Sequence, residues 1–195
     1  LYSLEELKEI RRVCDKYGMY LFVDGARMGY GLGSEANDVS LRDFGQLADV
    51  FYLGGTKCGA LFGEAVVLLA DSLKHRFKTY MKQNGAVLAK GWLLGLQFYA
   101  LLENGEYFKI TARADKLAMR LKEAFAEKGI PSAVDSPTNQ QFVILTPLQE
   151  EKLAEKYIFE GMGTLEDGRK KVRFCTSWST TEDEIDALIA DIQVL

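Results

Sequence analysis

The sequence predicts an α/β fold in two parts: a parallel-sheet domain with connecting helices over residues 1–104, and a small α+β domain over residues 105–195. Residues 19–23 and 50–53 are short, wholly apolar runs, which are typical of parallel strands with both faces covered. Helical patterns precede both runs, as in a βαβ unit. After residue 131 the pattern changes to shorter strands and helices that alternate.

The chain begins with a predicted helix. Ser3 and Glu6 have the spacing of a capping box, in which two side chains satisfy free backbone N–H groups at the helix start. Apolar residues then recur at spacings of three and four, and Gly18 stands where a left-handed residue ends a helix. The strand at 19–23 follows, and the glycine-rich residues 28–37 are expected to form a loop above the sheet.

The second apolar run leads into a lysine on a glycine-rich loop. A short helix is expected at 41–47, then the strand at 50–53, then the tight loop that carries Lys57, and a second apolar run begins at residue 65. Asp24 and Lys57 each lie just past the carboxyl end of a strand. If the two strands are neighbours in one parallel sheet, both side chains face the same crevice.

The middle of the chain is expected to be helical. Residues 71–103 predict two helices divided near 83–85, and the second, at 86–102, is apolar nearly all round, which favours a buried spine or an oligomer contact. A third helix is expected at 107–128. The remaining elements are expected as strands at 142–145 and 172–175 and helices at 149–157 and 181–192.

Composition narrows the classes of function. With 195 residues, 48% hydrophobic and 27% charged, the chain is typical of globular proteins, and no apolar stretch approaches the roughly 20 residues of a membrane span. A net charge of -4 argues against a nucleic-acid partner. Three widely spaced cysteines and a single histidine match neither a disulfide framework nor a metal site, so we expect no metal and a cytoplasmic location.

The chemistry of Asp24 and Lys57 suits one cofactor in particular. A lysine that forms an imine and an aspartate that holds a protonated ring nitrogen are what pyridoxal phosphate requires of a protein. Arg27 would lie near the ring oxygen, and Thr56 would offer its hydroxyl to the phosphate. Each residue also has a plainer interpretation: Asp24 as part of a turn, Arg27 as a surface cation, Thr56 as a strand end, and Lys57 as a solvated hairpin residue.

Four motifs together resemble a known family. They are Phe-Val-Asp-Gly-Ala-Arg at 22–27, Phe-Tyr-Leu-Gly-Gly-Thr-Lys-Cys-Gly at 51–59, Met-Lys-Gln-Asn-Gly at 81–85 and Val-Arg-Phe-Cys-Thr-Ser-Trp at 172–178. In this order, the motifs resemble the low-specificity L-threonine aldolases, which belong to the aromatic amino acid β-eliminating lyase group of fold-type I pyridoxal-phosphate enzymes. The first two motifs are specific as a pair, and the other two are weaker.

The resemblance implies a role for each matching residue. Lys57 would be the Schiff-base lysine, Asp24 the partner of the pyridine nitrogen, and Arg27 a residue near the ring oxygen and the substrate. Arg173 would bind the substrate carboxylate through its planar guanidinium. Lys82 stands where the family usually has an arginine that reaches a neighbouring subunit's cofactor phosphate. Lysine keeps the positive charge of that arginine but lacks its bidentate guanidinium group.

The resemblance also implies a reaction and an assembly. The reaction is cleavage of a β-hydroxy-α-amino acid, such as threonine to glycine and acetaldehyde, in a homo-oligomer, dimer or tetramer. The family places its phosphate-binding loop and its ring-stacking aromatic residue before the region that this chain matches, so we expect an incomplete, C-terminal part of a longer polypeptide. Two alternatives stay open: a pyridoxal-dependent β-elimination on another amino acid, and an inactive fragment that serves only as a fold or assembly module.

Overall fold

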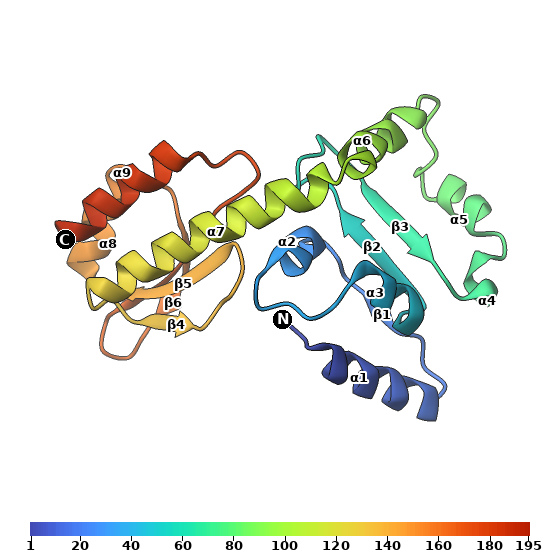
Figure 1. Cartoon of the computed structure of the whole chain (residues 1–195), viewed down its shortest axis with the longest axis horizontal. Coiled ribbons are helices and arrows are strands. Elements are labelled where there is room, and N and C mark those ends of the chain that lie inside the picture. The colour runs from blue at the N-terminus through green and yellow to red at the C-terminus, as the bar shows by residue number, and fades with distance from the viewer. The chain divides into compact units, whose positions relative to one another are not determined.

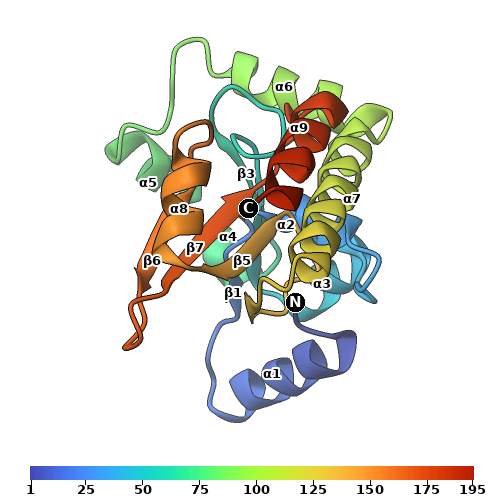
Figure 2. The ribbon, with the colours of Figure 1, turned by 90° about the vertical axis from the view of Figure 1, so that its left-hand side faces the viewer.

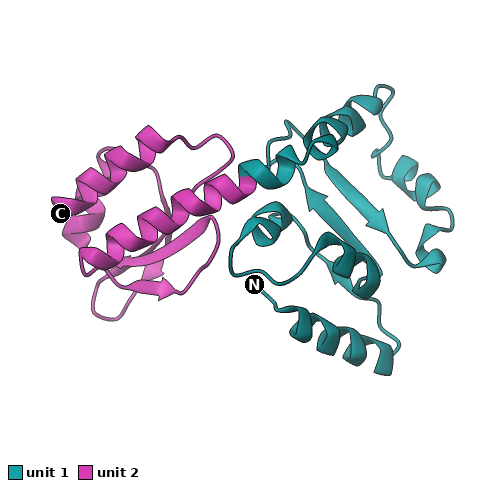
Figure 3. Ribbon diagram, viewed as in Figure 1, with its two compact units in different colours: residues 1–110 teal, residues 111–195 magenta.

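The computed structural model describes all 195 residues, and the chain divides into two compact units, residues 1–110 and 111–195 (Figures 1 and 3). Each unit has its own sheet. Unit 1 holds three strands in the order β1-β2-β3, and unit 2 holds four in the order β4-β5-β7-β6. The predicted α/β fold class is confirmed.

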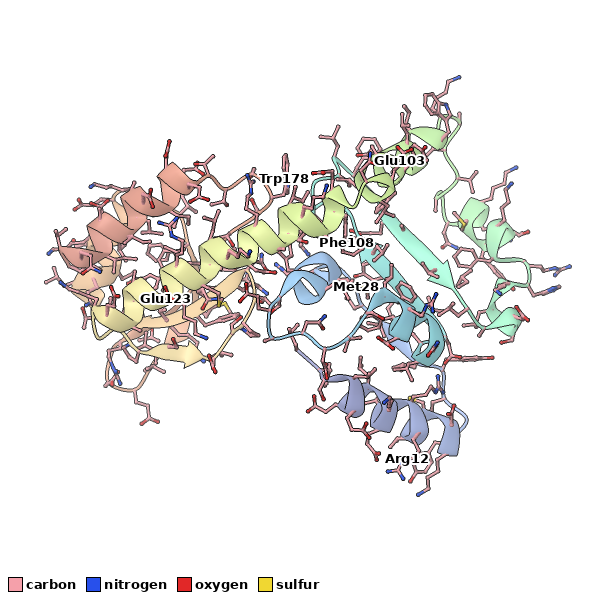
Figure 4. The ribbon with its side chains drawn as sticks, viewed as in Figure 1. Arg12, Met28, Glu103, Phe108, Glu123 and Trp178 are labelled. Atoms are coloured by element: carbon pink, nitrogen blue, oxygen red, sulfur yellow. The ribbon has the colours of Figure 1, made fainter.

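The first helix, α1 (Leu4–Lys16), begins at the predicted cap. The Ser3 hydroxyl accepts a hydrogen bond from the Glu6 backbone N–H at 3.2 Å, and the Glu6 carboxylate accepts one from the Ser3 N–H at 2.7 Å. One face of α1 is buried, while Arg12 projects from the outer face into solvent (Figure 4). Gly18 follows with φ of 63°, the left-handed conformation that its position predicts.

A helix replaces the loop expected at 28–37. α2 (Met28–Gly33) forms there because the side chains of Met28 and Tyr30 are buried at 7% and 1% exposure, and this burial outweighs the low helix propensity of the intervening glycines. The next helix, α3 (Leu41–Leu47), has the predicted bounds and a capping box at Ser40.

The sheet of unit 1 joins two parallel strands to a hairpin. β1 (Phe22–Val23) pairs in parallel with β2 (Val50–Gly54), and β2 pairs antiparallel with β3 (Glu64–Leu68). The expected neighbour relation of the two apolar strands is therefore confirmed. The expectation that the first strand is covered on both faces is wrong for this chain, because β1 is a two-residue edge strand and Phe22 is 59% exposed.

Three helices, rather than two, follow the sheet: α4 (Asp71–Lys74), α5 (Phe77–Gln83) and α6 (Trp92–Glu103). Within this chain α6 is not a buried spine, because Phe98 is its only buried residue and Trp92 is 64% exposed. No helix of the chain is both long and apolar enough to cross a membrane.

Unit 2 is a four-stranded antiparallel sheet covered by helices. Two helices, α7 (Glu106–Glu127) and α9 (Glu182–Gln193), lie side by side (Figures 1 and 2). Their apolar residues form one core with those of the strands, including Phe125, Val143, Val172 and Ile192. The last helix begins at a capping box formed by Thr181 and Glu184. The elements of this region are α7 (Glu106–Glu127), β4 (Ser132–Val134), β5 (Gln140–Leu145), α8 (Pro147–Ala154), β6 (Glu160–Thr164), β7 (Lys170–Cys175) and α9 (Glu182–Gln193).

A buried carboxyl group lies in unit 2. Asp115 on α7 is 4% exposed, and neither of its carboxylate oxygens has a hydrogen-bond partner. Burial raises the pKa of Asp115 to about 8, against a smaller opposing effect of the nearby Asn139 backbone N–H. The Thr176 hydroxyl, just after β7, donates to the carbonyl of Ala114, the residue before Asp115, at 2.7 Å. This bond ties the end of β7 to α7.

Candidate active site

The carboxyl ends of β1 and β2 place two loops side by side in unit 1. Residues 24–27, the Asp24 loop, follow β1 directly, and residues 55–63, the Lys57 loop, follow β2. Because the two strands are parallel neighbours, both loops leave the same edge of the sheet. The backbone N–H of Gly54, the last residue of β2, donates to the Gly25 carbonyl at 2.9 Å, so the Asp24 loop is fixed to the base of the Lys57 loop.

At two positions of this junction, Gly25 and Gly54, there is no room for a side chain. A Cβ atom on Gly25 would lie 1.7 Å from the Tyr52 carbonyl oxygen, and one on Gly54 would lie 2.2 Å from the Ala26 carbonyl oxygen. Neither glycine has a positive φ, so the close approach of the two backbones, and not a turn conformation, excludes a side chain. In the sequence, Asp24-Gly25 and Gly54-Gly55 indicate only turns.

The Asp24 carboxylate is held by two donors on one oxygen. Oδ1 accepts a hydrogen bond from the Tyr52 hydroxyl and another from the Ala26 backbone N–H at 3.0 Å. These two bonds, Tyr52 first, lower the pKa of Asp24 below its ordinary value, and the positive charges of Lys57 and Arg27 add to the effect. The exposed carboxylate is therefore ionised at neutral pH, and its Oδ2 remains available as an acceptor.

The Lys57 loop is anchored by its backbone, while the Lys57 side chain is exposed. The Tyr30 hydroxyl donates to the Lys57 carbonyl, and the buried Tyr107 hydroxyl donates to the Gly54 carbonyl at 3.0 Å. The Gly55 N–H donates to a carboxylate oxygen of Glu64 at 2.7 Å. These bonds fix the backbone on both sides of the turn, so the lysine ammonium extends from a rigid base.

A thiol lies beneath the same loop. Cys58, the residue after the lysine, is fully buried, and desolvation raises the pKa of its thiol. The burial keeps the thiol protonated and out of contact with solvent, so Cys58 serves as a small apolar anchor for the loop rather than a nucleophile.

A cavity of about 250 Å³ opens beside the Asp24 loop. Asp24 and Arg27 are its charged lining residues, and the rest of its wall is mostly apolar, with Val23, Met28 and Phe44 among the lining residues. Lys57 does not line this cavity. The cavity therefore brings Asp24 and Arg27 together, while Lys57 lies on the neighbouring loop and acts on Asp24 through its positive charge.

The remaining predicted site residues are Thr56, in the Lys57 loop itself, Lys82 on α5, and Arg173 in unit 2. Thr56 is exposed in the turn after β2, and Lys82 is exposed near the end of α5. Arg173 lies on β7 in unit 2, where its Nη1 donates to Gln140 Oε1 at 2.9 Å and its Nη2 forms an ion pair with Glu160. Its Nε is buried and has no partner.

The side chains at the junction fit the chemical requirements of pyridoxal phosphate. An ionised carboxylate with one free oxygen suits a protonated ring nitrogen, and an exposed primary amine on a rigid loop suits an aldehyde carbon. The chain contains no group of three His, Cys, Asp or Glu side chains that would hold a metal ion. The Asp24 carboxylate and the Lys57 amine would suit an organic cofactor with an acidic N–H and a carbonyl.

Several contributors were missed by sequence reasoning. Tyr52, Tyr30 and Tyr107 reach the two loops from β2, α2 and α7, and Glu160 reaches Arg173 from β6. The sequence carries no signal for these contacts, because each depends on strand register or helix packing between residues far apart in the chain.

The sequence of the chain matches one family and several curated proteins. A sequence model of the family described as beta-eliminating lyase matches residues 1–147. A low specificity L-threonine aldolase of Pseudomonas sp. (strain NCIMB 10558) is 30% identical over 203 residues, which cover all of this chain and 56% of the relative. The chain spans about half the length of the curated Pseudomonas relatives that it matches.

Solved structures agree with this match. The structure of a Leishmania major threonine aldolase superposes with a TM-score of 0.97 at 39% identity, over 99% of this chain and 56% of that chain. A lysine aminotransferase from M. tuberculosis superposes with a TM-score of 0.57 at 19% identity, over 99% of this chain and 45% of that chain, a likeness of fold alone.

Proposed function

The chain belongs to the beta-eliminating lyase family, and we propose that it carries part of the active site of a pyridoxal-phosphate-dependent lyase that cleaves a β-hydroxy-α-amino acid. The substrate we propose is threonine, cleaved to glycine and acetaldehyde, because the Pseudomonas and Leishmania major relatives are named as threonine aldolases. The observation that carries the proposal is the junction at which the Asp24 loop and the base of the Lys57 loop are hydrogen-bonded together.

Two residues of the junction would hold the reactive part of the cofactor. Bound pyridoxal phosphate supplies an electron sink for the electron pair left when a bond to the substrate α-carbon breaks. The Asp24 carboxylate would accept the ring N–H through its free oxygen, and its low pKa keeps the proton on the ring. The Lys57 amine would hold the cofactor at its carbonyl carbon. Arg27 would lie near the ring oxygen.

The remaining predicted residues would contact phosphate and substrate. The Thr56 hydroxyl and, in an oligomer, the Lys82 ammonium would bind the cofactor phosphate. The Arg173 guanidinium would bind the carboxylate of the amino acid, in place of the Glu160 carboxylate that it meets in the structure.

A second candidate reaction is β-elimination on another amino acid. The description of the family supports it, and it would use Asp24 and Lys57 in the same way. Assays of a panel of amino acids distinguish the two: the proposed reaction releases an aldehyde and glycine from threonine, whereas β-elimination releases a 2-oxo acid and ammonia.

We also propose that the protein is a cytoplasmic homo-oligomer, a dimer or a tetramer. The exposed apolar side chains of α6, among them Trp92, Leu96 and Tyr99, support a contact with another polypeptide surface. Cys14 and Cys58 are buried thiols outside any disulfide, which supports a reducing compartment.

The proposed function is tested by finding which lysine carries the cofactor. The chain is mixed with pyridoxal phosphate, reduced with borohydride and digested, and the labelled peptide is identified by mass spectrometry. We expect label at Lys57, no such label in Lys57→Ala, and unchanged labelling in Lys78→Ala, which removes an exposed lysine of α5. Equal labelling of surface lysines, with no preference for Lys57, would contradict the assignment.

A further inference from the structure

The Tyr52 hydroxyl contacts the residue on which the proposed cofactor site depends. It crosses from β2 to the neighbouring loop and donates to Asp24 Oδ1, the same oxygen that accepts the Ala26 N–H. Two donors on one oxygen fix the rotation of the carboxylate, because a turn about the Cβ–Cγ bond would break both bonds. The second oxygen, Oδ2, is left as the acceptor for an incoming group.

The Tyr52 ring has little freedom to leave this position. Its backbone lies in the middle of β2, paired with Val66 on β3, and its ring packs against the Phe22 ring with centroids 6.1 Å apart. Its carbonyl oxygen faces Gly25 at a distance that admits no side chain there. The hydroxyl is therefore placed by the sheet and not by a flexible loop.

We propose that Tyr52 is a positioning residue that acts through Asp24: it orients the carboxylate so that Oδ2 faces the ring nitrogen of the cofactor, and it makes that carboxylate less basic. This inference rests on the proposed function for its purpose, although the contact itself belongs to the chain alone. Nothing in the four sequence motifs assigns such a role to Tyr52.

The charges at the contact agree with this role. The hydrogen bond from Tyr52 is the largest of the effects that lower the pKa of Asp24, and the same bond raises the pKa of Tyr52 to about 12. Tyr52 therefore keeps its proton throughout the neutral range and acts only as a donor. A less basic Asp24 leaves the shared proton on the ring nitrogen, which is the charge state that makes the ring an electron sink.

The first test needs no cofactor. In the chain labelled with 13C at aspartate side chains, the Asp24 carboxyl is titrated by NMR in the parent, in Tyr52→Phe and in Tyr20→Phe. Tyr20 is the matched control, because its exposed hydroxyl bonds Ser72 and not Asp24. We expect the Asp24 midpoint to rise in Tyr52→Phe and to stay unchanged in Tyr20→Phe. An unchanged midpoint in a folded Tyr52→Phe chain would overturn the proposal.

The second test asks whether Tyr52 acts through Asp24 on the cofactor. Dissociation constants for pyridoxal phosphate are measured for the parent, Tyr52→Phe, Asp24→Asn and the double variant. Loss of one hydrogen bond to the carboxylate predicts binding about three- to tenfold weaker in Tyr52→Phe and no further loss when Asp24→Asn is already present. Full additivity of the two losses would overturn the inference. If the parent carries no label on Lys57, the proposed function fails, and the NMR titration still decides the effect of Tyr52 on Asp24.

Discussion

Replacement of Asp115 by asparagine tests how the chain tolerates an unpartnered buried carboxyl group. Asp115 is 4% exposed and neither oxygen has a hydrogen-bond partner, so the ionised form is penalised by lost hydration. Its pKa is about 8 in the folded chain, against an ordinary value of 3.8. Between these two values the folded state keeps a proton that the unfolded state has lost.

The sign and size of the effect follow from this difference in bound protons. Because the folded state binds more protons, stability falls as the pH rises through the window from about 4 to about 8. The slope is roughly 1 to 2 kcal/mol for each pH unit, or about 3 kcal/mol between about pH 5 and pH 7. Asparagine does not titrate, so the stability of Asp115→Asn relative to the parent should rise by this amount over the same interval.

The assay is urea unfolding of the whole chain at several pH values. The parent and every variant carry Trp92→Phe, so that the fluorescence of the remaining tryptophan, Trp178, reports on unit 2 alone. Asp135→Asn is the control: the ion pair with Lys122 lowers the pKa of this exposed carboxyl, so its effect should be constant above about pH 5. A pH-independent difference between Asp115→Asn and the parent would refute the reasoning.

Three further substitutions test the junction and a helix cap. Gly25→Ala should disrupt unit 1, because the new Cβ would meet a carbonyl oxygen at 1.7 Å. Gly45→Ala, inside a helix and with no atom within 4 Å of the new Cβ, should stabilise unit 1 by about 0.5–1 kcal/mol. Thermal unfolding compares the two variants. Tyr107→Phe removes the buried bond to the Gly54 carbonyl and should cost about 1–3 kcal/mol in urea unfolding. Thr181→Ala should cost about 1 kcal/mol, and Thr181→Ser, which restores the cap, should recover most of it.

Local signals in the sequence predicted the elements that depend on local chemistry. The capping box at Ser3 marks where α1 begins, and the two apolar runs become β1 and β2 in one parallel pair. The helix α2 was missed because glycine has low helix propensity, and only the burial of Tyr30 supports a helix there. β6 was missed because its residues are all exposed and two are glycines, so no apolar alternation exists.

The sequence predicts the reactive residues of the candidate site but not the contacts that hold them in place. An aspartate and a lysine at the ends of two apolar strands are visible in the sequence. The contact between Tyr52 and Asp24 depends on the register of β1 against β2, and that of Arg173 with Glu160 depends on a strand without a sequence signal. The assignment to cofactor and substrate of Lys57, Asp24, Arg27, Thr56, Lys82 and Arg173 stays a prediction, of which the labelling experiment tests the part for Lys57.

The order of the strands has a consequence for how unit 1 folds. The β2–β3 hairpin closes over a short loop, whereas the Tyr52–Asp24 bond joins residues 28 positions apart, and longer closures cost more chain entropy. We therefore expect the hairpin to form early and β1 to dock late, which pulse-labelled hydrogen exchange at the Gly54 N–H would detect as delayed protection. In a newly made chain, Asp24 would then reach its place as the proposed partner of the cofactor ring only in the final stage of the folding of unit 1.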